Sequence, residues 1–184
     1  LDEHDLTEPC PKRRGKRKYV RYQWPISNYM WHCDWSEYKG WWYCVYIDDR
    51  SRKIMAAGRF KHATTKNALF VLYQAILINK VCPVVILSDK GSQFYANKRD
   101  KEGYANHGFE QFLKRNGVKH ILCRYKHPKS NGKVERFFLT YKTEYATGSF
   151  KHIGDFIKHY NEERLHMSLG YKTPKELWDE LSVP

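Results

Sequence analysis

The chain has 184 residues, the size of one ordinary domain with or without a tail, and its 41% hydrophobic content is enough for a sizeable core. With 33 Lys and Arg residues against 20 Asp and Glu residues, it carries a formal net charge of +13. A globular chain this basic most often has a polyanionic partner, and nucleic acid is the leading candidate. No stretch approaches a membrane span or a signal peptide, so we expect a cytoplasmic protein, associated with the nucleoid in a prokaryote.

The cysteine pattern excludes a zinc site and favours a reducing compartment. The five cysteines form no C-x-x-C pair, and most of them lie inside apolar runs. None of the nine histidines stands at a zinc-site spacing from them. We therefore predict buried free thiols at all five positions, which are Cys10, Cys33, Cys44, Cys82 and Cys123.

Residues 1–28 are polar, basic and interrupted by prolines, which predicts a linker or an extended arm. The first residue is Leu1 and not Met, so we expect a further region upstream. The run "KRRGKRKYVR" at residues 12–21 carries seven basic residues in ten positions. It is either a solvated linker or a contact to the phosphate backbone of DNA. The candidate DNA-binding residues here are Lys12, Arg13, Arg14, Lys16, Arg17 and Lys18.

Residues 29–184 have the patterns of one folded domain. Apolar runs at 29–35, 40–47 and 52–60 predict three strands, separated by short turns at 36–39 and 48–51. Together they predict an antiparallel meander. Residues 64–79 repeat apolar positions with a helical period, and Thr64 or Thr65 offers an N-cap.

The second half of the domain predicts two more strands and four helices. Residues 84–87 indicate a strand buried on both faces, and 118–124 indicate another. Residues 95–107 predict a loop, and helices are expected at 108–117, from about 131 to 145, at 150–164 and at 173–181. Gly117 closes the first of these helices, and Thr173 with Pro174 opens the last. The order of elements predicts an α/β fold with a mixed five-stranded sheet, an antiparallel meander plus two parallel strands, flanked by helices.

The stretch "LSDKGSQF" at residues 87–94 places Asp89 between a buried strand and a glycine turn. Asp before Gly is ordinary turn chemistry. A carboxylate at the C-terminal end of a buried strand also lies where open α/β sheets place their ligands. The stretch alone leaves both interpretations open.

In this order of elements, three acidic residues lie at similar levels along the predicted sheet. Asp34 lies in the first strand, Asp89 follows the fourth, and Glu135 lies in the first turns of the helix after the fifth. If the first and fourth strands are neighbours, the three side chains converge. Close carboxylates repel one another, and oxygen ligands favour Mg²⁺ or Mn²⁺. Two such ions roughly 3.5–4 Å apart would support phosphoryl transfer.

The sequence resembles the DDE group of transposases and retroviral-type integrases, in the insertion-sequence transposase branch of the ribonuclease-H-like superfamily. The resemblance covers about residues 30–180, and it rests on "WHCDWSE", "YIDDRSRKI", "FKHATTKNAL", "LSDKGSQF", "HPKSNGKVERFF" and "YNEERLHMSLGYKTPKELW". It implies a ribonuclease-H-like fold, DNA end cleavage and strand transfer, and two Mg²⁺ or Mn²⁺ ions held by Asp34, Asp89 and Glu135. Lys90 stands where this family more often has Asn, and the spacing from Asp89 to Glu135 is longer than usual.

Other residues near the three carboxylates are candidates for binding DNA. Beside a metal site, lysines would hold phosphates, and Asn131 and Gly132 would let the DNA backbone approach the start of a helix. The predicted DNA-binding residues of this region are Lys129, Asn131, Gly132, Lys133 and Lys142.

Three nearby residues also have interpretations that involve no catalytic role. His32 shares a strand face with Asp34 and is either a site residue or a packed core histidine. Asp48 and Asp49 are interpreted as turn residues.

The expected partners are element-end and target DNA, and a second copy of the chain in the active complex. Two alternatives stay open: a domesticated core that binds DNA without catalysis, and a ribonuclease-H-like nuclease without strand transfer.

Overall fold

The computed structural model describes residues 23–99, 101, 103, 106–123, 131–145 and 150–181. Its elements, in chain order, are β1 (Met30–Tyr38), β2 (Trp41–Asp48), β3 (Ile54–Phe60), α1 (Thr65–Asn79), β4 (Val85–Ser88), α2 (Gly108–Arg115), β5 (Lys119–Leu122), α3 (Gly132–Glu144), α4 (Ile153–Glu162), the 3₁₀ helix η4 (Met167–Leu169) and α5 (Pro174–Leu181). None of the helices in these ranges is long and apolar enough to cross a membrane.

The five strands form one mixed sheet in the order β3-β2-β1-β4-β5. β1 pairs antiparallel with β2, and β2 pairs antiparallel with β3, which confirms the meander. β4 pairs parallel with both β1 and β5. Because β1 and β4 are adjacent and parallel, their C-terminal ends point to the same edge of the sheet, as the sequence predicted.

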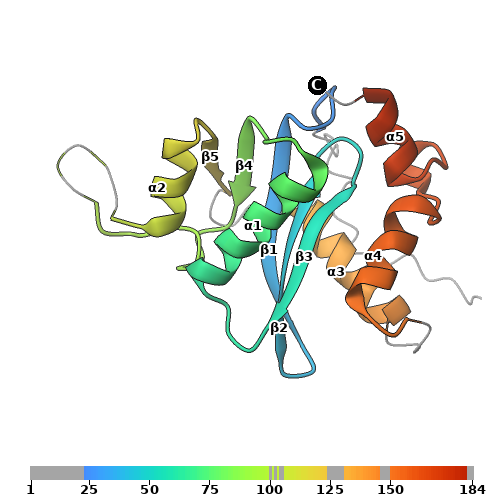
Figure 1. Cartoon of the computed structure of the whole chain (residues 1–184), viewed down its shortest axis with the longest axis horizontal. Coiled ribbons are helices and arrows are strands. Elements are labelled where there is room, and N and C mark those ends of the chain that lie inside the picture. Colours follow the sequence, from blue (N-terminus) through green and yellow to red (C-terminus); the bar gives the residue numbers. More distant parts are fainter. Residues whose placement is uncertain are drawn as a thin grey trace, which may run out of the picture.

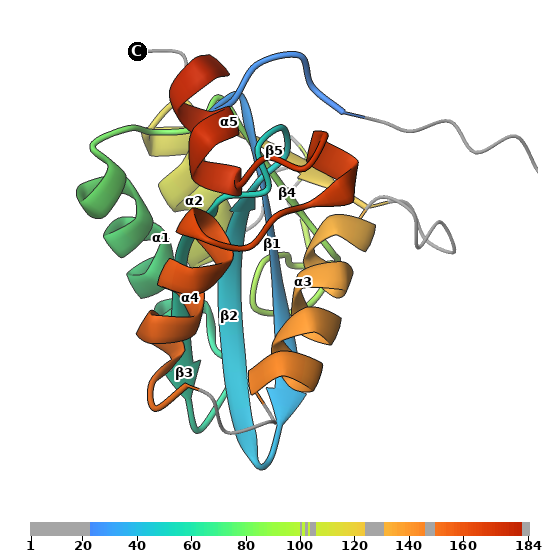
Figure 2. The same cartoon turned by 90° about the vertical axis from the view of Figure 1, so that its right-hand side faces the viewer.

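Helices cover both faces of the sheet (Figures 1 and 2). α1 and α2 pack on one face through a cluster that includes Trp31, Val71 and Phe109. α3 and α4 pack on the other face through a second cluster that includes Val45, Phe137 and Phe156. Figure 2 shows α1 and α3 on opposite sides of the strands. Each strand residue therefore faces either α1 and α2 or α3 and α4.

The first hairpin differs from its prediction. The turn was expected at residues 36–39, but β1 continues to Tyr38 and the connection is the pair Lys39–Gly40. Both residues have positive φ, 51° and 74°. Two-residue turns of this kind match the right-handed twist of the strands, so the ladder extends to Tyr38↔Trp41.

Predicted helix caps fall close to their expected positions. Thr64 caps α1 by accepting a hydrogen bond from the backbone N–H of Asn67. Thr173 and Glu176 cap α5 reciprocally, each side chain accepting from the other's backbone N–H, at 3.2 and 2.7 Å. Gly117 takes a positive φ of 69° just after α2, as a helix-closing glycine does.

Asn161 at the end of α4 connects the C-terminal helices to the sheet edge. Its side-chain oxygen accepts from the backbone N–H of Ile54 at 2.8 Å, and its side-chain nitrogen donates to the carbonyl of Ile54 at 3.0 Å. Asn161 and Ile54 are both buried. The pair therefore satisfies two backbone groups at the start of the edge strand β3, where no strand supplies partners.

Replacing this amide should destabilise the fold. Asn161→Ala leaves a buried donor and a buried acceptor of Ile54 without partners, and we expect a free energy of unfolding lower by about 2 kcal/mol. Urea denaturation measures the loss. Lys158→Ala, at an exposed position of the same helix, is the control and should change stability by about 0.5 kcal/mol or less. Equal stability of the two variants would show that the amide has no anchoring role.

Candidate active site

Asp34 lies in β1 on the sheet face covered by α3. Both of its carboxylate oxygens accept a hydrogen bond: Oδ1 from the backbone N–H of Trp35 at 2.7 Å, and Oδ2 from the Asn131 side-chain amide at 2.8 Å. Two donors on two oxygens fix the plane of the carboxylate. The first predicted site residue is therefore held in one orientation by its own strand and by the residue that precedes α3.

The three predicted carboxylates lie in one electrostatic neighbourhood. The pKa of Asp34 is raised to about 7, first by burial, then by the negative charge of Asp89, and to a smaller degree by that of Glu135. The hydrogen bonds from Trp35 and Asn131 act in the opposite direction. Asp34 thus feels both of its predicted partners, one from the adjacent parallel strand and one from α3.

Asp89 has the turn geometry that one interpretation of its sequence predicted, and its role as a metal ligand stays a prediction. It follows β4 and is exposed, and its Oδ1 accepts from the backbone N–H of Gly91 at 2.9 Å, as in an ordinary Asx turn. A Cβ at Gly91 would come within 2.9 Å of that oxygen. The missing side chain at residue 91 therefore lets the turn hold the Asp89 carboxylate beside Asp34.

Glu135 lies in the first turn of α3 with an exposed side chain. Together with Asp34 and Asp89 it offers only carboxylate oxygens, the donors that hard divalent cations prefer. A cation would offset the repulsion that raises the pKa of Asp34. The donor set therefore fits Mg²⁺ or Mn²⁺. Within the described ranges, no three Asp, Glu, His or Cys side chains are arranged so that they could hold a metal ion as they stand.

Cys123, just after β5, lies close to the same carboxylates, and the sequence analysis did not place it there. Its pKa is raised to about 12 by burial and by the charges of Asp34, Asp89 and Glu135. The thiol is therefore neutral at physiological pH. Its position follows from the β4–β5 pairing, in which the Cys123 N–H donates to the carbonyl of Ser88 at 2.8 Å. Described cysteines 33, 44, 82 and 123 are free thiols, as predicted, but only Cys33 and Cys44 are buried, since Cys82 is exposed and Cys123 is half-buried. Cys10 lies outside the described residues.

A buried polar network lies behind Asp34, on the same face of the sheet. The side-chain oxygen of Asn131 faces Nδ1 of His32 at 3.4 Å, and Nε2 of His32 lies 2.7 Å from Oδ1 of Asp49. The Lys133 ammonium contacts the same Asp49 oxygen and donates to the Asp49 carbonyl at 3.0 Å. Asp49 and His32 are 0% and 1% exposed. Two residues at the start of α3 are thus tied to one buried acidic residue.

Electrostatics keeps this network ionic. Burial alone would raise the pKa of Asp49, but the hydrogen bond and charge of His32, with the charge of Lys133, lower it below its usual range. Burial and the charge of Arg52 lower the pKa of Lys133 to about 8, against the opposing effect of Asp49. Asp49 is therefore a carboxylate at neutral pH.

The two adjacent aspartates of the second turn have different roles. Asp48 is a turn residue, as predicted: its Oδ2 accepts from the backbone N–H and the hydroxyl of Ser51, each at 2.7 Å. Asp49 lies beside that turn but directs its side chain to His32 and Lys133. The turn interpretation is thus incomplete for Asp49. The only hint in the sequence was His32, two residues before Asp34 on the same strand face.

The predicted DNA contacts have contrasting surroundings. Lys133 directs its ammonium to Asp49, and Asn131 to Asp34, so the structure engages both within the protein. Gly132 has no described atom within 4 Å of where a Cβ would stand, so the start of α3 is open on that side. Lys142 lies in the last turn of α3. The remaining candidates, Lys129 and the six basic residues of the arm, lie outside the described residues.

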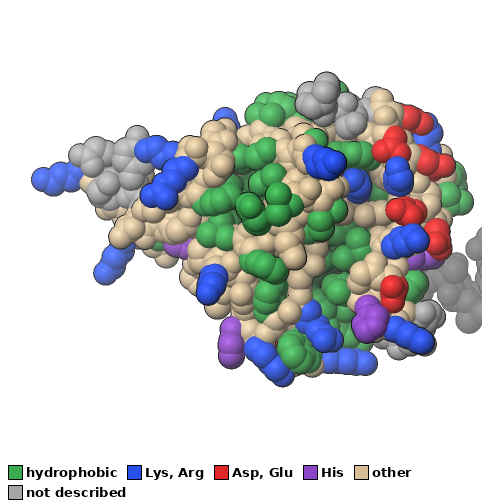
Figure 3. Space-filling model, in the orientation of Figure 1, with side chains coloured by type: hydrophobic (Ala, Val, Ile, Leu, Met, Phe, Trp, Pro, Cys, Tyr) green, Lys and Arg blue, Asp and Glu red, His purple; other side chains and the backbone are tan. Residues whose placement is uncertain are grey.

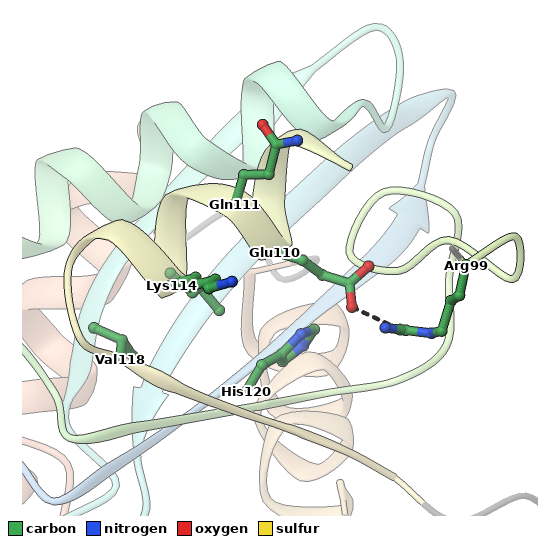
Figure 4. Close-up of a pocket in the computed structure, with 7 residues that line it drawn as sticks. Arg99, Glu110, Gln111, Lys114, Val118 and His120 are labelled. Atoms are coloured by element: carbon green, nitrogen blue, oxygen red, sulfur yellow. Dashed lines mark hydrogen bonds and ion pairs between the residues drawn. The ribbon is translucent and has the colours of Figure 1, made fainter. Parts of the chain in front are cut away.

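A separate pocket of about 390 Å³ lies between α2, β5 and the loop that contains Arg99 (Figure 4). His120 lines it, and burial lowers the pKa of His120 to about 4, so the ring is neutral at pH 7. Nε2 of His120 lies 2.8 Å from the hydroxyl of Ser88, the residue before Asp89. His120 packs against Phe109, so the pocket belongs to the α1 and α2 face, opposite to Asp34.

The raised pKa of Asp34 predicts how stability depends on pH. Between about pH 4 and pH 7 the native state keeps this proton more tightly than the unfolded chain, so stability contributed by Asp34 falls as pH rises and is lowest above pH 7. Asp34→Asn removes the titration. In a chelator-treated sample, we expect the variant to be more stable than the parent at pH 8 by a few kcal/mol, with the difference shrinking towards pH 5.

Thermal unfolding at both pH values measures this difference. Glu37→Gln is the control, because Glu37 is exposed in the same strand and its side-chain oxygen accepts from the Gly40 N–H, which Gln can replace. If the stability difference between Asp34→Asn and the parent does not change with pH, burial and the neighbouring carboxylates do not disfavour the charged form of Asp34.

Comparison with known proteins assigns the chain to a family. The sequence profile of the integrase core domain matches residues 25–128, and a second integrase core domain profile matches residues 116–174. ORF3 of Spiroplasma virus SpV1-C74, whose name describes an integrase, is 31% identical over an alignment of 158 residues, and the match covers 77% of this chain and 43% of that protein. The IS2D transposase InsD of Escherichia coli (strain K12) is 30% identical over an alignment of 102 residues, and the match covers 51% of this chain and 31% of that protein. The chain thus spans less than half the length of either relative.

Solved structures show the same fold. The HTLV-2 integrase catalytic core domain, determined in complex with magnesium in a trimeric form, superposes with a TM-score of 0.63 at 20% identity, over 83% of this chain and 97% of that one. A chain in the structure of the simian T-cell lymphotropic virus intasome in complex with PP2A regulatory subunit B56 gamma gives a TM-score of 0.72 at 20% identity, over 95% of this chain and 62% of that one. The mixed five-stranded sheet is therefore the ribonuclease-H-like sheet that the sequence predicted, and the chain belongs to the integrase core domain family.

Proposed function

We propose that the chain is the catalytic core of a DDE transposase or integrase, which cleaves DNA ends and joins their 3′-hydroxyls to target DNA. The observation that carries the proposal is the electrostatic coupling of Asp34 to Asp89 and Glu135. A buried carboxylate beside two others is a costly arrangement unless cations offset it. Membership of the integrase core domain family supports the same reaction class.

In this proposal Asp34, Asp89 and Glu135 hold two Mg²⁺ or Mn²⁺ ions. When bound, such ions supply activation of the attacking oxygen and charge stabilisation of the leaving oxygen. The protein's part is to present the carboxylates in fixed orientations. Asp34 is fixed by Trp35 and Asn131, and Asp89 by Gly91.

The proposed DNA substrate fits the distribution of charge. Acidic side chains gather over α4 and α5, as Figure 3 shows for one face of the molecule. In α5 they are Glu176, Asp179 and Glu180. Asp179 and Glu180 pair there with Lys175 and Lys172, whereas Gly132 leaves the start of α3 open next to Glu135. We propose that DNA approaches the start of α3, and that Lys129, Lys142 and the basic arm at residues 12–18 contact its phosphates. We also propose that the protein is cytoplasmic.

A homo-oligomer is proposed for the active complex. Helix α1 exposes Phe70, Tyr73 and Leu77 at 52%, 55% and 56%, on one side of the helix. Exposed apolar side chains at this spacing are typical of a contact surface. The related HTLV-2 core was solved in dimeric and trimeric forms. Neither a DNA-binding core without catalysis nor a nuclease without strand transfer is favoured by any observation.

Glu135 tests the catalytic proposal. Glu135→Gln keeps the size of the side chain and removes its charge, so we expect cleavage and joining to slow by a factor of about 10³ or more. DNA affinity should stay the same or rise slightly, since one negative charge near phosphates is gone. Product formation in Mg²⁺ and Mn²⁺ is compared with gel-shift affinity.

The matched control is Glu144→Gln, at the other end of the same helix, where the carboxylate pairs with Arg164. It should join DNA at close to the parental rate. If Glu135→Gln joins DNA at the parental rate, Glu135 is not part of the metal site. The products of the parent protein then test the two alternatives, a nuclease without strand transfer and a core that only binds DNA.

The basic arm tests the proposed contact with DNA. Each phosphate neutralised releases counterions and steepens the log-log salt dependence of binding by about 0.9. Deleting residues 1–21 should therefore flatten the slope in filter-binding titrations. A full-length variant with the seven basic residues of 12–21 replaced by Gln separates charge from length. An unchanged slope in both variants would identify the arm as a passive linker.

A further inference from the structure

We propose that Asp49 is a positioning residue, which sets the place of α3 against the sheet and so brings Glu135 to Asp34. This inference rests on the proposed metal-dependent function and extends it to a residue outside the three carboxylates. Asp49 touches none of the three. It acts through His32, Asn131 and Lys133.

The starting point is how the beginning of α3 is held near Asp34. Glu135 and Asp34 are 101 positions apart by their residue numbers, and they belong to different elements. Apolar contacts of α3 run from Val134 in its first turn to Phe137 and Tyr141. An apolar seam resists sliding only weakly, because neighbouring turns of a helix offer similar surfaces. Directional contacts are therefore needed to fix the position of the first turn along the helix axis.

Asp49 supplies those contacts through two residues of the α3 start. Lys133, inside the first turn, donates to the Asp49 carbonyl at 3.0 Å and contacts the Asp49 carboxylate. Asn131, the N-cap residue, is reached through His32, whose ring lies 2.7 Å from Asp49 and 3.4 Å from the Asn131 oxygen. Asn131 and Lys133, about half a helical turn apart, are thus both tied to Asp49. Contacts at two such positions fix where α3 lies along its axis and how it is rotated about that axis.

The same contacts orient the Asp34 carboxylate. Because His32 faces the oxygen of the Asn131 amide, the nitrogen of that amide points at Asp34, to which it donates at 2.8 Å. An Asn131 amide turned the other way would present its oxygen to Asp34, and two acceptors repel. Partners of metal-binding residues commonly act in this way, and their loss typically costs 10–100-fold in metal affinity or activity.

Asp49 is itself held in place, so it can serve as a reference point. Its Oδ2 accepts from the backbone N–H of Trp24 at 2.7 Å, and its own N–H donates to the carbonyl of Met30 at 2.9 Å. The side chain is fully buried. The Asp49 carboxylate therefore belongs to the rigid sheet, and α3 is the element that it locates.

The chain provides a matched control in the preceding residue. Asp48 and Asp49 are both buried and adjacent, but the Asp48 carboxylate accepts hydrogen bonds from Ser51 and Arg50 of the turn and from the backbone N–H of Asn28, ahead of β1. Asp48→Asn and Asp49→Asn make the same chemical change one residue apart. A purely structural role predicts similar consequences for both, whereas a positioning role predicts different ones.

The first measurement is amide hydrogen exchange on the metal-free full chain. The N–H groups of Val134 and Glu135 both donate to the carbonyl of Asn131, at 3.0 and 3.2 Å, so their exchange reports the docking of the α3 start. In Asp49→Asn we expect exchange there to be faster by about tenfold. In Asp48→Asn the faster exchange should be confined to the turn at residues 49–53 and to the N–H of Asn28.

The second measurement is Mn²⁺ affinity, by titration calorimetry of both variants and the parent. Asp49→Asn should bind Mn²⁺ about tenfold or more weakly, with a lower kcat for strand transfer and an unchanged KM for DNA. Asp48→Asn should lower Tm and keep the parental Mn²⁺ affinity. If Asp49→Asn does not fold, Lys133→Met removes the second tie to α3, and faster exchange with weaker Mn²⁺ binding is expected again.

The outcomes separate this inference from the proposed function. A parent that binds no Mn²⁺ and joins no DNA contradicts the proposed function, while the exchange experiment still tests the docking of α3. A parent that binds Mn²⁺ alongside an Asp49→Asn variant of parental affinity and parental exchange at α3 overturns the inference. So does an equal loss of Mn²⁺ affinity in Asp48→Asn and Asp49→Asn.

Discussion

The charge on the Asp34 carboxylate is the constraint on which the rest of the site depends. A carboxylate that is largely buried and lies near two others is unfavourable, and the pKa of about 7 measures that cost. A fold does not keep such a group for stability, because an amide or an apolar side chain would serve better. The arrangement is retained where the charge is used, which is why the carboxylates point to chemistry and not to packing.

The same repulsion explains why each carboxylate is restrained by a different kind of contact. Asp34 is held by two donors from separate elements, and Asp89 by the Gly91 N–H in a turn that only glycine fits without crowding the carboxylate oxygen. Glu135 depends on the docking of a whole helix. Repelling side chains left unrestrained would turn away from one another, so the restraints keep the three side chains together.

The two faces of the sheet have different roles. On the α1 and α2 face the sheet is apolar through Trp31, Tyr46 and Ile86, and this cluster gives most of the tertiary stability a simple apolar source. On the α3 face the apolar seam ends where His32 and Asp49 begin. Polar groups buried at that boundary cost stability unless fully paired, and here their pairing determines where α3 begins.

The sequence by itself determined the elements and the residue types of the site. Period-two and period-3.6 patterns identified five strands and the main helices, and Asp34, Asp89 and Glu135 followed from where they stand relative to those elements. The hairpin turn was misplaced, because Lys39 carries no sign that it will adopt a positive φ. Only the tertiary structure decided that Asp49 faces α3 while Asp48 faces its own turn, that Lys133 binds Asp49, and that Cys123 lies beside the carboxylates. These contacts join residues dozens of positions apart, and long-range hydrogen bonds leave no periodic trace in the chain, whereas burial and local turns do.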